Sequence, residues 1–186
     1  AIAMIIGSII GAFFAIKVEM TQMPQLVAIF NGFGGGASAL VASSEFLKAF
    51  NNGDLTNLGF LGISITLSVL VGTLTFTGSF IAFGKLQGLI TTKPVTFIGQ
   101  QPLNALIAIT LVVSTYLIPS YGINSFYIIV GLSALLGILL VIPIGGADMP
   151  VVISLLNSYS GIAAAMTGFV LVSSGNTSAG NALIVC

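Results

Sequence analysis

The sequence predicts an all-α integral membrane protein, a bundle of six transmembrane helices, and three observations indicate this fold. Of the 186 residues, 56% are hydrophobic and only 4% are charged, whereas a soluble domain carries about 25% charged residues. The apolar segments are long and continuous, as membrane-spanning helices require, and do not alternate as barrel strands do. Charged residues, prolines and Asn/Gly clusters separate these segments from one another.

The six spans are predicted at 1–16, 24–44, 58–83, 103–118, 123–142 and 150–172. A tight polar connection with Lys17 and Glu19 follows the first span, and a polar loop with Glu45 and Lys48 follows the second. The third span is rich in Ser and Thr, and the long loop after it holds Lys85. A short turn separates the fourth span from the fifth.

The sixth span follows a polar, glycine-rich loop. Asp148 stands at its N-cap position, and Pro150 lies in the first turn, where a missing N–H costs nothing. The chain begins inside an apolar run, and residues 181–186 look like the opening turn of another span. We therefore expect a fragment that lacks further helices at both ends.

Lysines predict the orientation in the membrane. Lys17, Lys85 and Lys93 fall on one side of the predicted bundle, and only Lys48 falls on the other. The positive-inside rule places the three-lysine side in the cytoplasm, or in the matrix if the membrane is mitochondrial.

The composition excludes several classes of function. Zero net charge and the absence of arginine give no basis for nucleic acid binding. A single cysteine, Cys186, excludes a disulfide framework and a cysteine-based metal site. The sequence has neither a phosphate-binding loop after a strand nor a nucleophile with a base. We therefore expect no catalytic, metal-binding or cofactor-binding residues in this chain, and a lipid bilayer around it.

The second and sixth spans begin alike. Residues 23–35 align without gaps with 149–161, and both read Met-Pro, six residues, Asn, then small, aromatic, small, Gly. Both spans start from the lysine-rich side, so Asn31 and Asn157 should lie at equal depth on parallel helices. The echo favours paired structural roles, although Pro at a helix start and Gly in a membrane helix are common enough to match by chance.

Small and polar residues recur at three- and four-residue steps on both of these spans. They are Asn31, Gly34, Gly35, Ser38 and Ala42 on one, and Ser154, Asn157, Ser158, Gly161, Ala165 and Gly168 on the other. Such a stripe lets helix backbones approach closely, with polar members facing a neighbour or trapped water. Helix packing and a hydrated path through the bundle both require this pattern, so both interpretations stay open.

The third span adds a row of hydroxyls at Ser68, Thr75 and Ser79, which would line a water path beside the two asparagines. Each hydroxyl alone could simply bond to its own helix. The middle of every span lacks Asp, Glu, Lys and His. Asparagine takes up no proton at physiological pH, but its amide can hold and orient water.

Three motifs in order resemble the beta subunit of proton-translocating NAD(P) transhydrogenase. They are KVEMTQMPQLVA at 17–28, TFTGSFIAFGKLQG at 75–88, and IGGADMP at 144–150 continuing to NSYSG at 157–161. The resemblance implies that residues 1–186 belong to the membrane domain, which conducts protons while soluble domains pass hydride between NADH and NADP. The enzyme is of the Re/Si-specific kind, and this fragment alone has no hydride-transfer site.

The resemblance also implies cofactors, partners and a location. The fragment binds no cofactor, whereas the complete enzyme binds NADP(H) on a domain downstream of this chain and NAD(H) on the alpha subunit. Expected partners are the membrane helices and NAD(H)-binding domain of the alpha subunit, the chain's own NADP(H)-binding domain, and a second copy in a homodimer of the complex. The implied location is the bacterial inner (plasma) membrane, or alternatively the mitochondrial inner membrane.

Several residues match positions that matter in that family. Asn157 falls in its proton path, and Asp148 lies near the face of the NADP(H) domain. Asn31 stands where many members carry a membrane-embedded His, so here the protonatable group must come from water or from a partner's helix. The expected proton path comprises Asn31, Asn157, Ser158, Ser154, Ser68, Thr75 and Ser79. The expected coupling residues at the inner face are Asp148, Glu19 and Lys85.

Two other functions remain open from the sequence. One is a secondary transporter with its site between the helices at 24–44 and 150–172. The other is a purely structural bundle, in which replacing Asn157 would change stability alone. A nucleotide-binding domain encoded downstream would favour the transhydrogenase over the transporter.

Overall fold

The computed structural model describes residues 2–53 and 59–185, and within these ranges the chain is helical without strands, as predicted. Its helices are α1 (Ile2–Lys17), α2 (Met23–Asn51), α3 (Gly59–Leu86), α4 (Gln100–Tyr121), α5 (Ile123–Val141), α6 (Met149–Ser173) and α7 (Thr177–Val185). Two short 3-10 turns, η1 (Met20–Gln22) and η3 (Gly146–Asp148), precede α2 and α6.

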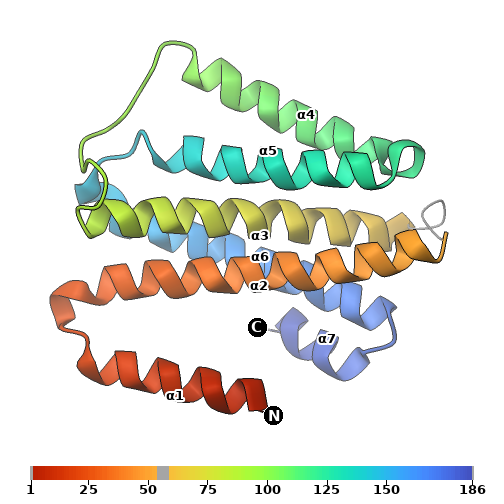
Figure 1. The fold of residues 1–186 in the computed structure, drawn as a ribbon, viewed down its shortest axis with the longest axis horizontal. Helices are drawn as coiled ribbons and strands as arrows, with labels where there is room; N and C mark the ends of the chain where they lie inside the picture. The colour runs from red at the N-terminus through yellow and green to blue at the C-terminus, as the bar shows by residue number, and fades with distance from the viewer. Residues whose placement is uncertain (1, 54–58, 186) are drawn as a thin grey trace.

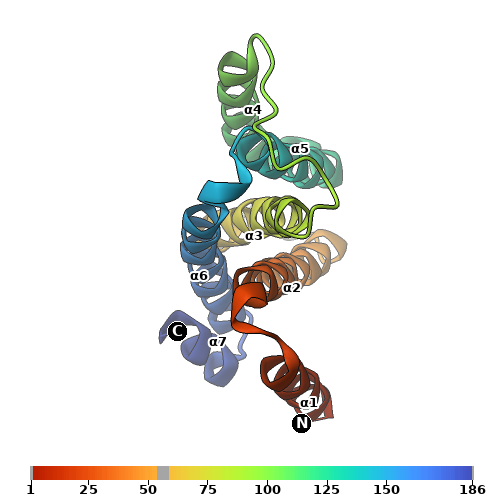
Figure 2. The same cartoon turned by 90° about the vertical axis from the view of Figure 1, so that its left-hand side faces the viewer.

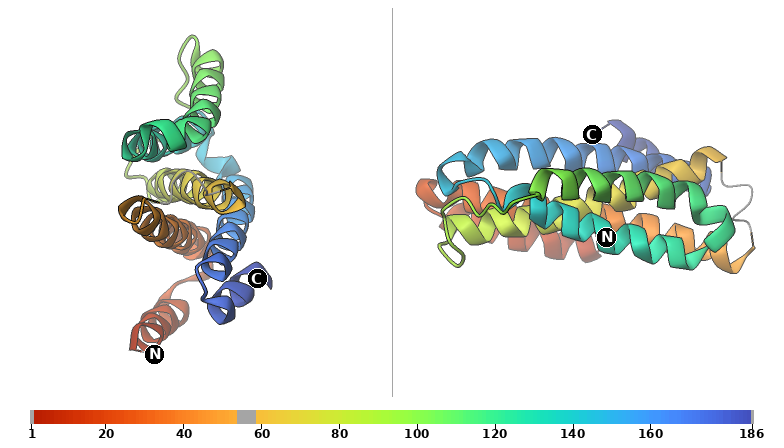
Figure 3. Two further views of the ribbon diagram at one scale, coloured as in Figure 1. Left: turned by 90° about the vertical axis from the view of Figure 1, so that its right-hand side faces the viewer. Right: turned by 90° about the horizontal axis from the view of Figure 1, so that it is seen from above.

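Helix α3 is the centre of the bundle. It packs against α2, α5 and α6, and α2 also packs against α6 (Figure 1). Viewed from one end, α4 lies beyond α5 at one edge, whereas α1 lies at the opposite edge beyond α2 (Figure 2). Seen from above, the long helices run close to a common direction (Figure 3). The three-helix contact of α2, α3 and α6 therefore forms the interior where polar groups can be enclosed.

Five helices in the described part of the chain are long and apolar enough to cross a membrane. They cover Met20–Asn51, Phe60–Leu86, Gln100–Ile118, Ile123–Val141 and Gly146–Ser173. The chain is thus a multi-pass membrane protein, because each of these helices has at least 19 residues and a bilayer core requires about 17–25. The first predicted span is also helical, but α1 has only 16 residues, so the sixth crossing is not confirmed.

Two predicted loops are wrong because helices continue through them. Helix α2 runs on to Asn51, and Glu45 and Lys48, three residues apart, form an ion pair of 2.5 Å on its surface. This spacing suits a helix, where residues three apart are neighbours. Helix α4 begins at Gln100 and continues to Tyr121, so the predicted turn before α5 shrinks to Gly122. Gly122 has a φ of +53°, a conformation that glycine adopts without strain.

Glycines set the distance between α2 and α3. A Cβ atom added to Gly72 would lie 2.6 Å from the carbonyl oxygen of Gly35, and one added to Gly35 would lie 2.8 Å from that of Gly72. No side chain fits between these backbones. The close approach expected from small residues is therefore confirmed on α2, and it brings the polar residues of three helices within hydrogen-bonding distance.

Candidate functional site

The amide of Asn31 joins three helices. Its side chain is only 7% exposed, and its Nδ2 atom donates to Ser79 Oγ on α3 at 2.9 Å. Its Oδ1 atom accepts from Ser160 Oγ on α6 at 2.7 Å. The amide nitrogen of Asn31 is thus paired with Ser79, and its amide oxygen shares the one Ser160 hydroxyl proton with the backbone carbonyl of Asn157.

A cavity of about 360 Å³ adjoins this network between α2 and α6. Val27, Phe30, Asn31, Gly34, Asn157 and Ser160 line it. Asn31 and Asn157, which the repeated sequence places at equal depth, thus meet at one cavity. Asn31 points its amide into the bundle, whereas Asn157 is exposed and its backbone carbonyl is the alternative acceptor for Ser160 Oγ, at 2.8 Å. The cavity is polar on the sides formed by these residues and large enough to hold water.

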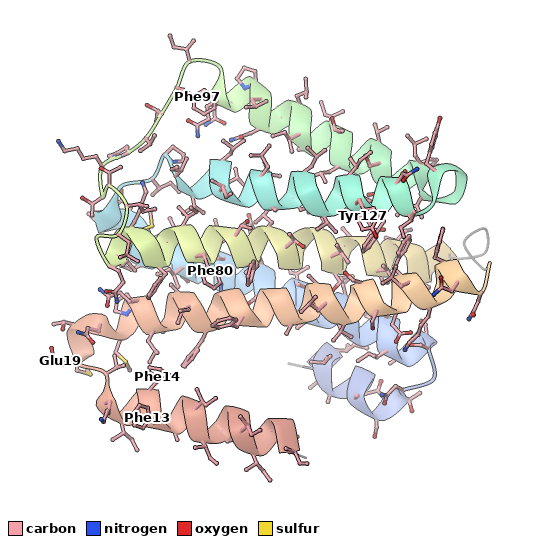
Figure 4. The ribbon with its side chains drawn as sticks, in the orientation of Figure 1. Phe13, Phe14, Glu19, Phe80, Phe97 and Tyr127 are labelled. Carbon is pink, nitrogen blue, oxygen red and sulfur yellow. The ribbon has the colours of Figure 1, made fainter. Side chains whose placement is uncertain are left out.

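Aromatic rings flank the Asn31 network. Phe80 follows Ser79 on α3 and lies between α3 and α2 (Figure 4). Its ring packs edge-on against Phe33 of α2, with the ring centroids 5.6 Å apart. A Cβ atom on Gly32 would lie 3.2 Å from this ring. The network therefore sits in an apolar wall, where its hydrogen bonds are stronger than in water.

The sequence repeat is accompanied by a similar backbone conformation in the turns that lead into α2 and α6. Glu19 precedes η1 with φ −69° and ψ 152°, and Gly145 precedes η3 with φ −70° and ψ 154°. Gln22 and Asp148 then have φ −97° and −91°, with ψ close to zero in both. The turns η1 and η3 share a backbone conformation although their sequences differ. Met20-Thr21-Gln22 in η1 corresponds to Gly146-Ala147-Asp148 in η3.

The predicted polar stripe of α6 mostly faces away from the bundle. Ser154, Asn157, Ser158 and Gly161 are all exposed, and Ser158 Oγ donates to its own helix at Ser154 O, at 3.2 Å. These four residues are therefore not buried against another described helix of this chain, whereas Gly168 of the same stripe packs closely against Gly180 of α7. The physical reason is that α6 turns its larger apolar side chains inward; they include Val152, Ile153 and Leu156.

The hydroxyl row of α3 does face the interior. Ser68, Thr75 and Ser79 have no exposed surface. Ser79 belongs to the Asn31 network. Thr75 Oγ1 has no hydrogen-bond partner among the described residues. Ser68 Oγ lies 2.5 Å from Thr167 Oγ1 on α6.

Ser160 and Thr167 are the site residues that sequence reasoning missed. They lie seven residues apart, two turns of a helix, so they share one face. The seven-residue spacing is the sequence feature that could have identified both residues. It was hidden because small and polar residues occupy more than one side of α6.

Lys85 is buried in the last turn of α3 rather than lying in a loop. Its side chain is 1% exposed. Its Nζ atom donates to the carbonyl oxygens of Ile142 at 2.6 Å, Ile144 at 2.7 Å and Lys93 at 3.2 Å. Both the C-terminal end of α5 and the loop at 87–99 are therefore held by one ammonium group.

The three predicted inner-face residues are not paired with one another. Asp148 occupies the N-cap position of α6, but it is exposed and its side chain makes no capping hydrogen bond. Glu19 is exposed in the turn between α1 and α2 (Figure 4). Within the described part of the chain the one recorded ion pair is Glu45 with Lys48. Residues 2–53 and 59–185 also hold no cluster of three or more His, Cys, Asp or Glu that could bind a metal.

Comparison with known proteins assigns the chain to a family. A family model described as NAD(P) transhydrogenase beta subunit matches residues 1–185. Two relatives from Rhodospirillum rubrum, one of them from a defined strain and both named NAD(P) transhydrogenase subunit beta, are 47% identical to the chain over 178 residues. The match covers 91% of this chain but 38% of each relative, so the chain spans well under half of their length. Agreement over nearly all of the sequence shows that this chain belongs to the NAD(P) transhydrogenase beta subunit family.

Proposed function

We propose that this chain is part of the proton-conducting membrane domain of a Re/Si-specific, proton-translocating NAD(P) transhydrogenase. The complete enzyme would pass hydride between NADH and NADP on soluble domains, with NADP(H) bound downstream on this polypeptide and NAD(H) bound by the alpha subunit. The observation that carries the proposal is the buried Asn31 amide, held by Ser79 and Ser160 beside the cavity at Asn157. A buried amide in a membrane span marks a pathway or an interhelix contact, and the cavity beside Asn31 and Asn157 favours the pathway.

Asn31 and Asn157 would orient water in this path without holding a proton. Both hydrogen-bonding ends of Asn31 are occupied, so the amide fixes the hydroxyls of Ser79 and Ser160. The Ser160 hydroxyl, which lines the cavity, keeps lone-pair capacity toward water there. A proton would then move along oriented water rather than reside on asparagine. Ser68 and Thr75 would continue the path along α3.

The outward stripe of α6 supports a partner helix. Ser154, Asn157 and Ser158 are exposed on a helix that crosses the membrane, and polar side chains in spans seldom face lipid. We expect a membrane helix of the alpha subunit to cover this stripe. Such a helix would supply the protonatable group that Asn31 lacks.

The inner face would couple the membrane domain to the NADP(H) domain. Lys85 fixes the carbonyls of Ile142 and Ile144, and this connection leads directly into η3 and Asp148. A fixed connection would present the exposed Asp148 carboxylate to the soluble domain, with Glu19 on the corresponding turn before α2. We further propose a homodimer of the complex in the bacterial inner membrane, the mitochondrial inner membrane being the alternative.

A secondary transporter remains the alternative function. The cavity between α2 and α6, reached through two matched helix starts, is the observation that favours it. A transporter would move its solute in proteoliposomes without nucleotides. A transhydrogenase would move protons only when both nucleotides are present.

Asn157→Leu in the complete enzyme tests the proposed function. We expect the variant to lose proton movement in proteoliposomes, because leucine removes the amide beside the cavity and fills polar space. Asn124→Leu is the control, since Asn124 is exposed near the start of α5, away from the cavity. Unchanged pumping by Asn157→Leu would overturn the role given to Asn157. Lost stability with unchanged pumping per folded enzyme would favour a structural bundle.

A further inference from the structure

A second buried polar layer connects the same three helices. Ser68 of α3 and Thr167 of α6 are 0% and 1% exposed. Both hydroxyls lie near the carbonyl oxygen of Ser38 on α2, at 3.4 and 3.3 Å. Both also lie near the carbonyl oxygen of Ala163 on α6, at 3.1 and 2.9 Å. The two hydroxyl oxygens are themselves 2.5 Å apart, and either can be the donor.

Counting protons shows that this layer can adopt more than one hydrogen-bonding state. The hydroxyls of Ser68 and Thr167 carry two protons but have five possible hydrogen bonds among themselves and the carbonyls of Ser38 and Ala163. In one state Ser68 donates to Thr167, and Thr167 donates to a carbonyl. In the other state the direction is reversed. Rotation of two O–H bonds interconverts the states without moving a helix, because each hydroxyl is both a donor and an acceptor.

The layer lies in the other half of α3 from the Asn31 network. Ser68 and Ser79 are eleven residues apart on α3, which is about 16 Å along the helix. Thr75 lies on the same buried row between them, and its hydroxyl has no partner among the described residues. A buried hydroxyl without a protein partner is where an internal water is expected. The contact of Gly35 with Gly72 lies at this intermediate level and keeps the space narrow.

We propose that Ser68 and Thr167 form a second proton-relay station, which carries protons between the Asn31 network and the side of the membrane opposite the three lysines. The inference rests on the proposed proton path and extends it. A proton delivered by water binds a lone pair of Ser68 Oγ, whose own proton passes to Thr167 Oγ1. The Thr167 hydroxyl turns from its carbonyl acceptor to a water molecule, which takes its proton, so one proton enters and one departs. Rotation of both hydroxyls then restores the starting state.

The test replaces hydroxyls in the complete enzyme reconstituted in proteoliposomes. Thr167→Val keeps a similar shape and removes the relay hydroxyl, so we expect the proton flux to fall by about a hundredfold, the usual contribution of a positioned proton-transfer group. Thr167→Ser keeps the hydroxyl and should restore most of the flux. Ser68→Ala provides an independent variant if Thr167→Val does not fold, and it should lower the flux similarly.

Thr66→Val is the matched control. Thr66 is also buried on α3, but its hydroxyl donates to its own helix at Gly62 O, at 2.7 Å. We expect this variant to retain the flux. Normal flux in both Thr167→Val and Ser68→Ala would overturn the relay, and so would a Thr167→Ser variant as slow as Thr167→Val. If Asn157→Leu blocks pumping while these variants pump normally, the relay fails together with the continuation of the path through Ser68, and the role of Asn157 stands. If Asn157→Leu pumps normally, the proposed function fails.

Discussion

Replacing Lys85 by methionine should weaken the contact between the loop at 87–99 and the connection at 142–148. Methionine fills a similar volume but donates no hydrogen bond, so the carbonyls of Ile142, Ile144 and Lys93 lose the ammonium that joins them. Two of these three hydrogen bonds are short, at 2.6 and 2.7 Å, as charge-assisted bonds are. The loop at 87–99 and the connection at 142–148 should then separate more readily.

The magnitude follows from those two short bonds. A hydrogen bond to a charged group contributes about 1.5–3 kcal/mol, and the lower value for both gives about 3 kcal/mol. Ile142 and Ile144 are only partly buried, so water can replace part of the interaction. We therefore expect a loss of about 2 kcal/mol in the free energy of local opening, which is roughly a 30-fold change in the opening equilibrium.

Hydrogen exchange measured by mass spectrometry checks this value. The amide of Gly146 donates to Thr92 O at 2.8 Å, and that of Val95 donates to Ile142 O at 3.2 Å, so both report on contact between loop and connection. Exchange at these amides should be roughly 30-fold faster in Lys85→Met. Lys93→Met is the control, because the Lys93 side chain is exposed and its carbonyl is retained. Unchanged protection at both amides in Lys85→Met would refute the proposed role of Lys85 in holding the loop to the connection.

Two further predictions concern the interior. Gly35→Ala should lower stability by about 1–3 kcal/mol, because its Cβ would lie 2.8 Å from the Gly72 carbonyl oxygen. Gly34→Ala should be tolerated, since nothing lies within 4 Å of its Cβ; thermal unfolding in detergent compares the two. Asn31→His should make the proton flux depend on pH, because imidazole can gain and lose a proton near physiological pH whereas the asparagine amide cannot. If the proton flux depended on pH in the same way in the Asn31→His variant and in the unsubstituted enzyme, a proton path at this residue would be contradicted.

Local patterns predicted the features that depend on neighbouring residues. Hydropathy located the helices, and the repeated Met-Pro and Asn identified two parallel helices that meet at one cavity. The boundaries were less predictable where polar residues continue a helix. Glu45 and Lys48 suggested a loop because both are charged, yet their spacing lets them pair on a helix surface.

Features set by contacts distant in sequence could not be predicted in the same way. Lys85 looked like a loop lysine used for orientation, because its carbonyl acceptors at Ile142 and Ile144 lie more than fifty residues away. Asp148 was correctly placed at the N-cap position, but η3 directs the chain into α6 without a bond from its carboxylate. The inward face of α6 was likewise ambiguous, since both of its sides carry small and polar residues.

That ambiguity of α6 has a functional consequence. Ser160 and Thr167 face the interior and join the two buried polar layers on α3, whereas Ser154 and Ser158 are exposed. Asn157 lies at the boundary, exposed but lining the cavity that Asn31 also lines. A helix with polar groups on two sides can bond to its own bundle and to a partner at once. In the proposed enzyme, this position would let a protonatable group on a partner helix reach the Asn31 network through Asn157, although this chain carries no such group in the middle of its spans.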